Sequence, residues 1–391
     1  MDGVYLMKIA FVFDGLGFGG IERIGLDYVR MSIELGYEVD VYNLNPKFSE
    51  MVDDLKRING RINYFPISFS RKKCPETYSY GIQKWWWGKY AFCAISPILS
   101  LYQLLFKVFK KRKKYDIAIS IAGHINDLSF VAKSFIVSRT KIVWCHGNMI
   151  SYLAICDAYS ILYKKVDKIV TLSSAAQKDS FAGKMFLYDK KITKIYNPTF
   201  INEKIINENY VSMLKEKYGD FILMIARAEW RKGFDVAIKV VKELKDSGLE
   251  KKIIFLGDGP CLNEYKELSI KLGVDNLCVF EGNKTNVCDY IVASYVNLLT
   301  SRWEGLPTVI IEAMSFGKPC VMTNTDDGEV SCNGKYCMLT EIDDVSDLTF
   351  CLKELYTNTS IYNKYCNLSQ ERSKDFSPKT IKSMFKALIE E

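Results

Sequence analysis

The sequence predicts an α/β protein built from two doubly wound parallel sheets in tandem. Short β-branched apolar runs alternate with longer helix-like segments, which is the pattern of parallel sheets covered by helices on both faces. One series of such runs ends near Asn197-Pro198, and a second, similar series begins after it. The length of 391 residues, of which 48% are hydrophobic and 25% charged, fits two globular domains.

Five strands are predicted in each series. In the first series they are Lys8–Phe13, Glu38–Asn43, Asp116–Ile121, Lys141–Cys145 and Lys168–Leu172; in the second they are Phe221–Ala226, Lys252–Leu256, Cys278–Glu281, Val296–Thr300 and Pro319–Thr323. Sheets of this kind bind their ligands at the carboxyl ends of the strands. Functional residues are therefore expected there.

The domain limits follow from a proline and from helical periodicity. The proline after Asn197 stops regular structure, so we expect a first domain at 1–198 and a second at 199–375. Residues 376–391 are predicted to form a last amphipathic helix that returns toward the first domain. Its apolar residues stand at helical spacing: Ile381, Phe385 and Leu388.

The net charge of +7 is unevenly distributed. Up to Thr199 the chain has 29 basic and 17 acidic residues, against 24 and 29 in the remainder, so the first half carries +12 and the second −5. Such asymmetry indicates that the first half faces an anionic surface, whether a membrane, a nucleic acid or a polyanion.

Cysteine and histidine usage indicates the compartment. The chain has twelve cysteines but no CxxC pair, and only two histidines, which argues against a zinc site and favours a reducing compartment. No basic region precedes the first apolar run, and no uncharged apolar stretch reaches about 18 residues. We therefore expect a cytoplasmic protein without a signal peptide or a transmembrane helix.

One segment, 84–114, departs from the α/β pattern. It begins with Lys84 and three tryptophans, continues through the uncharged residues 90–106, and ends in a cluster of lysines and one arginine. Tryptophans favour the membrane interface, and each basic residue adds about 1 kcal/mol near anionic lipid. Pro97 argues against a spanning helix. The segment is predicted to bind an anionic membrane surface, and a buried helix with a solvated basic end is the alternative.

A glycine loop follows the first predicted strand. Gly15, Gly17 and Gly20 satisfy G-x-G-x-x-G, a loop in which the backbone can approach a phosphate at a helix N-terminus. Asp40 lies about 20 residues on, as a dinucleotide site requires. However, it stands early in its strand, whereas a ribose-binding acid belongs at the carboxyl end, where Asn43 is found. This favours a phosphate-approach loop over a nicotinamide site, and a purely structural turn is the other alternative.

Two further motifs lie in the second half. Arg227 ends a predicted strand and Lys232 follows five residues later, so that both cations can converge on one anion unless the loop is merely solvated. The string Glu304-Gly-Leu-Pro-Thr308 precedes a helix expected over 307–316, whose N-terminal N–H groups could hold a diphosphate. Glu304 and Glu312 can accept hydrogen bonds from two hydroxyl-bearing parts of one ligand.

Together these motifs resemble the family 4 retaining glycosyltransferases. The resemblance rests on the GGxE loop at 19–22, the R-x4-KG segment at 227–233, the loop Gly257-Asp-Gly-Pro260 and, above all, EGLPTVIIE at 304–312. It implies the GT-B fold, in which two Rossmann-like domains face each other across a cleft and the second domain holds a sugar nucleotide.

The resemblance also implies roles for individual residues. Arg227 and Lys232 would neutralise the donor diphosphate, and Glu312 would bind the ribose. Glu304 would bind hydroxyls of the transferred sugar, with His146 beside that sugar. The remaining donor-site residues would be Gly19, Gly20, Gly305, Leu306, Pro307 and Thr308, and Glu22 would look toward the acceptor.

The expected reaction is retaining transfer of a hexosyl or N-acetylhexosaminyl group from a nucleotide-diphosphate sugar to a lipid-linked or polysaccharide glycan. UDP is favoured over GDP by family frequency alone. Fixed cations and a helix N-terminus can stabilise the departing diphosphate, so neither a metal nor another cofactor is expected. In keeping with this, Asp326 and Asp327 are adjacent and form no Asp-x-Asp element. We place the enzyme at the inner face of the cell membrane, as a peripheral protein with no nucleic-acid partner.

Three alternatives stand beside this interpretation. A soluble transferase acting on a small sugar acceptor would not bind vesicles. A nicotinamide-dependent dehydrogenase would account for the glycine loop but not for 304–312. A non-catalytic protein that binds sugar nucleotides or membranes would bind UDP without turnover.

Overall fold

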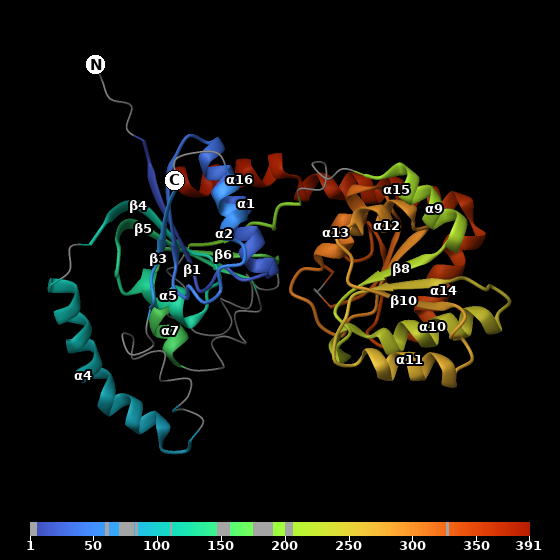
Figure 1. Cartoon of the computed structure of the whole chain (residues 1–391), viewed down its shortest axis with the longest axis horizontal. Helices are drawn as coiled ribbons and strands as arrows, with labels where there is room; N and C mark the ends of the chain where they lie inside the picture. Colours follow the sequence, from blue (N-terminus) through green and yellow to red (C-terminus); the bar gives the residue numbers. More distant parts are fainter. Residues whose placement is uncertain are drawn as a thin grey trace. The chain divides into compact units, whose positions relative to one another are not determined.

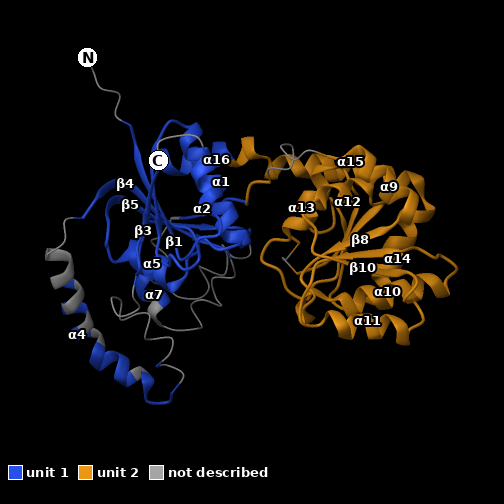
Figure 2. Cartoon of the chain, viewed as in Figure 1, with its two compact units in different colours: residues 1–196, 382–391 blue, residues 197–381 orange. Residues whose placement is uncertain are grey.

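The protein consists of two compact units, which are described separately. In this computed structural model the described residues are 6–58, 62–69, 82, 85–109, 112–146, 157–174, 191–199, 206–325 and 328–391. Unit 1 comprises Met1–Tyr196 with Lys382–Glu391, and unit 2 comprises Asn197–Ile381 (Figures 1 and 2). The division after Tyr196 lies two residues before the expected one.

The described part of unit 1 is a seven-stranded parallel sheet in the order β3-β2-β1-β4-β5-β6-β7, flanked by helices. Its strands are β1 (Lys8–Phe13), β2 (Glu38–Asn43), β3 (Ile62–Pro66), β4 (Lys114–Ser120), β5 (Val137–Cys145), β6 (Lys168–Thr171) and β7 (Lys191–Lys194). Its helices are α1 (Gly20–Glu34), α2 (Val52–Arg57), α4 (Gly88–Phe109), α5 (Ile125–Ala132) and α7 (Asp157–Tyr163). The strand order reverses between β1 and β4, so the loops after these strands lie where open α/β sheets bind ligands.

The described part of unit 2 is a six-stranded parallel sheet in the order β10-β9-β8-β11-β12-β13. Its strands are β8 (Ile222–Ile225), β9 (Ile253–Leu256), β10 (Cys278–Gly282), β11 (Val296–Leu299), β12 (Cys320–Thr323) and β13 (Met338–Thr340). Its helical segments are α9 (Glu208–Tyr218), the 3-10 turn η3 (Trp230–Lys232), α10 (Phe234–Asp246), α11 (Leu262–Lys271), α12 (Val287–Ala293), α13 (Thr308–Ser315), α14 (Val345–Thr357), α15 (Thr359–Ser373) and η4 (Lys374–Phe376). Here the order reverses between β8 and β11.

All ten predicted strands are present, but three further strands were not predicted. These are β3, β7 and β13, and each lies at an edge of its sheet. An edge strand is covered less completely than a central one. Every residue of β3 is at least partly exposed, so this strand lacks the near-continuous apolar run that marks a central strand.

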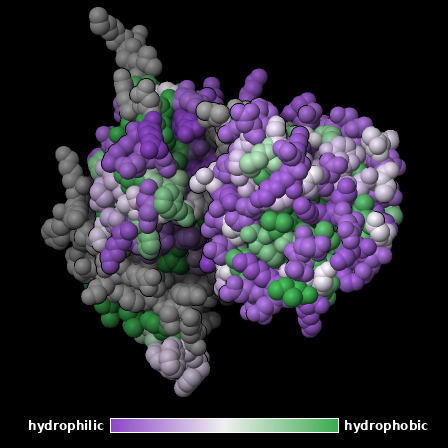
Figure 3. Space-filling model, turned by 45° about the vertical axis from the view of Figure 1, so that its right-hand side comes forward, coloured by the Kyte–Doolittle hydropathy of each residue, from purple (hydrophilic) through white to green (hydrophobic). Residues whose placement is uncertain are grey.

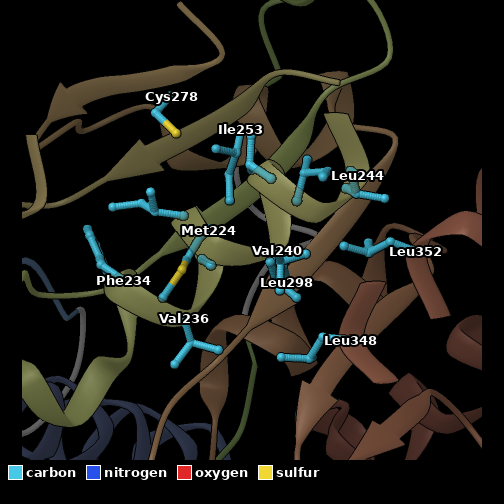
Figure 4. Packing of buried hydrophobic residues seen from close by; sticks show 14 of the residues in the cluster. Met224, Phe234, Val236, Val240, Leu244, Ile253, Cys278, Leu298, Leu348 and Leu352 are labelled. Atoms are coloured by element: carbon cyan, nitrogen blue, oxygen red, sulfur yellow. The ribbon is translucent and has the colours of Figure 1, made fainter. Parts of the chain in front are cut away.

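Apolar side chains from both sheet and helices form the core of unit 2. Figure 4 shows Met224 of β8 and Leu298 of β11 beside Val240 of α10 and Leu352 of α14, all of them buried. Strands in this position are mostly apolar because helices cover the sheet. The core thus holds β8 and β11 in place, and the loops after them begin at packed strands.

The last helix, α16 (Pro378–Glu390), ends in unit 1. Phe385 is fully buried, with its ring centroid 5.1 Å from that of Tyr28 on α1 and 6.0 Å from that of Trp144 on β5. Lys382 Nζ lies 2.6 Å from Glu34 Oε2. The tail from Lys382 therefore packs on the first unit, next to the strand that leads to His146.

Segment 84–114 contains the 22-residue helix α4. Pro97 lies inside this helix. Across the part of the chain that the structure describes, no helix is both long enough and apolar enough to span a membrane. Lys84, Lys110 and Lys111 of the predicted membrane segment lie outside the described residues.

Candidate active site

A cavity of about 530 Å³ opens in unit 2 at the carboxyl ends of β8 and β9. It is bounded by the start of α13 and by the loop after β10. Its lining residues are Ile225, Ala226, Arg227, Lys232, Leu256, Gly257, Asp258, Asn283, Lys284, Val287, Glu304, Leu306, Pro307, Thr308 and Val309. The cavity thus brings together six of the predicted donor-site residues from two separate motifs.

Two glycines allow the loops around this cavity to pack closely. Gly233 has φ +72°, and a Cβ there would lie 2.0 Å from the carbonyl oxygen of Thr300. Gly257 has φ +131°, and a Cβ there would lie 1.9 Å from the carbonyl oxygen of Ala226. Both positions require a residue without a side chain, because the backbone conformation and the space exclude one.

Lys232 and Glu304 form an ion pair in the cavity wall. The distance from Lys232 Nζ to Glu304 Oε1 is 2.5 Å, and Ser301 Oγ donates a hydrogen bond of 2.7 Å to the same oxygen. The side chains are only 15% and 11% exposed, so the pair is better shielded from solvent than a surface pair. A lysine carries three N–H donors, and this contact uses one of them.

Arg227 is also paired, through a carboxylate that it shares with a second arginine. Glu229 Oε1 lies 2.9 Å from Arg227 Nε, and Glu229 Oε2 accepts a hydrogen bond of 2.9 Å from Arg231 Nε. The hydrogen bond from Arg231 and the neighbouring cations hold the pKa of Glu229 below its usual value. The Arg227 side chain is 67% exposed, so its guanidinium can turn toward an anion in the cavity.

The start of α13 supplies backbone donors. This helix begins at Thr308, with Pro307 as its N-cap and no side chain capping its first N–H groups. Uncapped N–H groups at a helix start favour an anion. Glu312 is half-buried on the same helix, and neither it nor Gly305 lines the cavity.

Several lining residues were not predicted. Asn283, Lys284 and Val287 come from the loop after β10 and the start of α12. No local sequence motif marks these three residues. They reach the cavity because β10 lies at the edge of the sheet beside β9, and this strand order is not visible in the sequence.

In unit 1 the remaining predicted residues lie at the carboxyl ends of β1 and β5. Helix α1 begins at Gly20, with Gly19 as its N-cap and Glu22 in its first turn. His146, directly after β5, bonds through Nε2 to the carbonyl oxygen of Ile121 at 2.9 Å. Burial lowers the pKa of His146 to about 4. A carbonyl only accepts, so the neutral ring carries its proton on Nε2 and presents Nδ1 as an acceptor.

The second histidine lies at the same edge of the sheet. His124 Nδ1 is 3.7 Å from Asp14 Oδ2, and Asn126 donates to the other oxygen of that carboxylate at 2.7 Å. The contact with Asp14 raises the pKa of His124 above its usual value. The neighbouring Asp127 is fully buried, and loss of hydration raises its pKa to about 6. No local motif in the sequence marks His124.

Asp40 has no ligand-binding role in this structure. Its carboxylate is fully buried in the sheet, where Tyr115 Oη donates to it at 2.6 Å and Asn63 Nδ2 at 2.8 Å. The glycine loop therefore lacks the ribose-binding acid of a dinucleotide site, as its misplacement in the sequence indicated. Among the residues with described positions, no three His, Cys, Asp or Glu side chains form a cluster that could hold a metal ion.

Known proteins that are similar to this chain include several glycosyltransferases. Residues 207–368 match the family described as glycosyl transferases group 1. The chain is a glycosyltransferase. An uncharacterized glycosyltransferase of Haemophilus influenzae is 26% identical to it over 98% of this chain and 100% of that protein. The dehydrogenase alternative is therefore wrong.

Two further relatives extend the comparison of this glycosyltransferase. A Campylobacter jejuni enzyme named N-acetylgalactosamine-N,N'-diacetylbacillosaminyl-diphospho-undecaprenol 4-alpha-N-acetylgalactosaminyltransferase is 22% identical over 95% of this chain and 96% of that enzyme. The crystal structure of Anabaena HepE in complex with UDP superposes with a TM-score of 0.74 at 18% identity, covering 98% and 100% of the two chains. The predicted fold class, two Rossmann-like parallel-sheet domains of the GT-B type, is confirmed.

Proposed function

We propose that this glycosyltransferase moves a hexosyl or N-acetylhexosaminyl group from a UDP-sugar to a lipid-linked or polysaccharide glycan, with retention and without a metal, and that UDP is the leaving group. The observation that carries the proposal is the cavity in unit 2, where Lys232, Arg227 and the uncapped start of α13 converge. A lysine held in the cavity wall, an exposed arginine that can turn toward an anion, and a row of backbone N–H groups suit a diphosphate. The UDP bound to HepE supports UDP as the nucleotide.

The chemistry follows from the charge that develops. Breaking the bond between the sugar carbon and the diphosphate oxygen leaves negative charge on the departing group, which Lys232, Arg227 and the α13 N–H groups stabilise. Both bonds to Glu304 go to Oε1, so we assign Oε2 to a hydroxyl of the transferred sugar. We assign Glu312 to the ribose, with Gly305 beside the phosphates.

The acceptor side is assigned to unit 1. Helix α1 begins at Gly20, with Gly19 as its N-cap and no side-chain capping bond, so its first N–H groups would face a phosphate, and Glu22 in the first turn would bind an acceptor hydroxyl. His146 would accept a hydrogen bond from the transferred sugar through Nδ1. The name of the Campylobacter jejuni enzyme, a transferase acting on a diphospho-undecaprenol glycan, supports a lipid-linked acceptor.

The donor assignment is tested by calorimetry with UDP, GDP and their sugars, in the presence and absence of EDTA. Binding of UDP that survives EDTA supports the proposal, and binding of GDP alone would change the base. No binding of any nucleotide diphosphate would overturn the donor site. NMR of the product's anomeric centre decides between retention and inversion. Binding of UDP with no turnover against any acceptor would favour the non-catalytic alternative.

We further propose that α4 attaches the enzyme to an anionic membrane surface, at the inner face of the cell membrane. Trp86, Tyr90, Ile98 and Leu101 are 88%, 76%, 70% and 59% exposed, and the last three stand at helical spacing on one face. Aromatic and aliphatic side chains in this arrangement suit the headgroup boundary. By contrast, the face of unit 2 seen in Figure 3 shows apolar residues only in small patches.

Two residues of the basic cluster after α4 make contacts within the protein. Lys113 Nζ is 3.4 Å from Asp40 Oδ2 and 3.6 Å from the ring centroid of Phe65, and Arg112 donates to the carbonyl oxygen of Ser134 at 3.0 Å. Lys113 and Arg112 therefore contribute less to lipid binding than free basic side chains would, and the apolar face of α4 provides most of the binding to the membrane.

Vesicle co-sedimentation tests this attachment. Vesicles with 30% anionic lipid are expected to bind the unaltered chain, and the triple variant Trp86→Ser, Tyr90→Ser, Ile98→Ser should lose about tenfold or more in affinity. The matched control is Ile270→Ser with Phe350→Ser, which removes exposed apolar residues of unit 2 and should bind unchanged. Equal binding by both variants would overturn the proposal and favour an acceptor in solution.

A further inference from the structure

A mostly buried arginine outside the cavity joins the two segments that carry Lys232 and Glu304. The Arg302 guanidinium forms a bidentate pair with Asp235 at 3.0 and 2.7 Å, and it donates to the carbonyl oxygen of Trp230 at 2.6 Å. Its Nε lies 2.9 Å from Asp343 Oδ1. The Arg302 side chain is only 12% exposed and does not line the cavity.

The backbone reinforces this junction. The N–H of Arg302 donates to the carbonyl oxygen of Arg231 at 2.8 Å, and Thr300 Oγ1 donates to that of Gly233 at 2.7 Å. The turn 230–233 is therefore bonded to residues 300–302 from both sides of Lys232. The ring of Trp230 also packs on the guanidinium, with 4.7 Å from Cζ to the ring centroid.

Only an arginine can make these contacts together. A planar guanidinium binds a carboxylate through two parallel N–H bonds and still has donors for a carbonyl and a second carboxylate, whereas a lysine ammonium acts as a single point charge. Arg302 thus fixes the direction of the turn as well as its distance from the loop after β11.

We propose that Arg302 is a positioning residue that holds Lys232 in register with Glu304 and the start of α13 for diphosphate binding. The proposal rests on the proposed donor site. Lys232 directly follows the carbonyls that Arg302 binds, and Glu304 lies two residues after Arg302. A shift of the turn would move the Lys232 ammonium away from the α13 N–H groups, while the rest of the cavity stays in place.

The test separates diphosphate binding from binding of the nucleoside. Arg302→Met and Arg302→Lys are compared with the unaltered chain for affinity toward UDP and toward uridine, by calorimetry or competition. We expect UDP affinity to fall by about ten- to a hundredfold for Arg302→Met and by less for Arg302→Lys, because small displacements of a binding group have effects of this size. Uridine affinity should change by less than about twofold, since uridine has no phosphate for Lys232 to bind.

The matched control is Lys239→Met, because Lys239 is a second cation beside Asp235, at 3.9 Å from Oδ2. It removes a charge from the same carboxylate without touching the turn, so UDP affinity should stay unchanged. If Arg302→Met does not fold, Asp235→Asn keeps the shape of the junction and weakens the bidentate pair, and it should lower UDP affinity in the same direction.

The outcomes distinguish the two proposals. An unaltered chain that binds no nucleotide diphosphate overturns the donor site itself. An unaltered chain that binds UDP, with Arg302 variants that bind it equally well, overturns the role of Arg302 alone. Equal losses for UDP and uridine would also overturn it, because they would show a general effect on the fold.

Discussion

Lys232 Nζ lies 2.5 Å from Glu304 Oε1, so the cation expected to bind the diphosphate is held by the carboxylate expected to bind the sugar. The pair connects the turn after β8 with the loop after β11, on either side of the point where the strand order reverses. The diphosphate of a donor in the cavity would compete with Glu304 for the Lys232 ammonium. Substitution of Lys232 should therefore weaken UDP binding, whereas substitution of Glu304 should not.

Replacing Lys232 with Met should weaken UDP binding by about ten- to a hundredfold, because the diphosphate loses a charged donor. The fold should also lose about 1–3 kcal/mol, since Glu304 is left poorly hydrated without its partner. Calorimetry and urea unfolding measure the two effects. Lys242→Met, which removes an exposed ion pair on α10, serves as the control and should change neither.

Replacing Glu304 with Gln should leave UDP binding equal or tighter, because Lys232 no longer shares its charge with a carboxylate. Turnover of the UDP-sugar should nevertheless fall by about a hundredfold, as the sugar loses a charged hydrogen-bond partner in the transition state. Parallel measurement of UDP affinity and kcat shows whether the two move apart. A large loss of UDP affinity would contradict the assignment of Glu304 to the sugar.

Replacing Gly257 with Ala should destabilise unit 2 by about 1–3 kcal/mol or more, because the added Cβ meets the carbonyl oxygen of Ala226 in a conformation that favours glycine. Gly248→Ala is the matched control. Gly248 also has a positive φ, of +82°, but a Cβ there meets nothing within 4 Å. Urea unfolding of both variants should show the larger loss for Gly257→Ala, and equal losses would contradict the close approach.

Replacing Phe385 with Ala should destabilise unit 1 by about 3–5 kcal/mol, as expected for an aromatic ring removed from a packed core. The ring packs beside those of Tyr28 and Trp144, which also contact each other, although Phe385 belongs to the last helix of the chain. Lys386→Ala, an exposed neighbour on the same helix, is the control. Unchanged stability of Phe385→Ala would mean that the tail does not stabilise the first unit.

The pH dependence of stability should report on His146. Its pKa of about 4 in the folded state lies below the value near 6.5 in the unfolded chain, so between these values the unfolded state binds the proton first. The free energy of unfolding is therefore unaffected by His146 titration above pH 6.5, and it falls as the pH is lowered toward 4 because only the unfolded chain takes up the proton. His146→Gln removes this pH dependence, so the difference in stability between the two proteins should shift by about 1–3 kcal/mol across this window. A constant difference from pH 7 to pH 4 would contradict the burial of a neutral ring.

Part of the fold and of the site could be predicted because the responsible signals are local. Central strands such as β1 and β9 are near-continuous apolar runs, and the start of α13 is marked by Pro307. The edge strands β3, β7 and β13 lack such a run, and they form because a neighbouring strand offers them hydrogen bonds. The same holds for Asn283 and Lys284, which reach the cavity only through the position of β10.

The sequence by itself determined the two α/β units, the residue types of the proposed donor site and the basic character of the first half. These follow from periodicity, from spacing and from composition, all of which act along the chain. Only the tertiary structure decided that Arg302 joins the segments bearing Lys232 and Glu304, that Asp40 is bonded within the sheet, and that Phe385 completes the core of unit 1. Each of these contacts joins residues far apart in sequence, so it depends on how the elements pack.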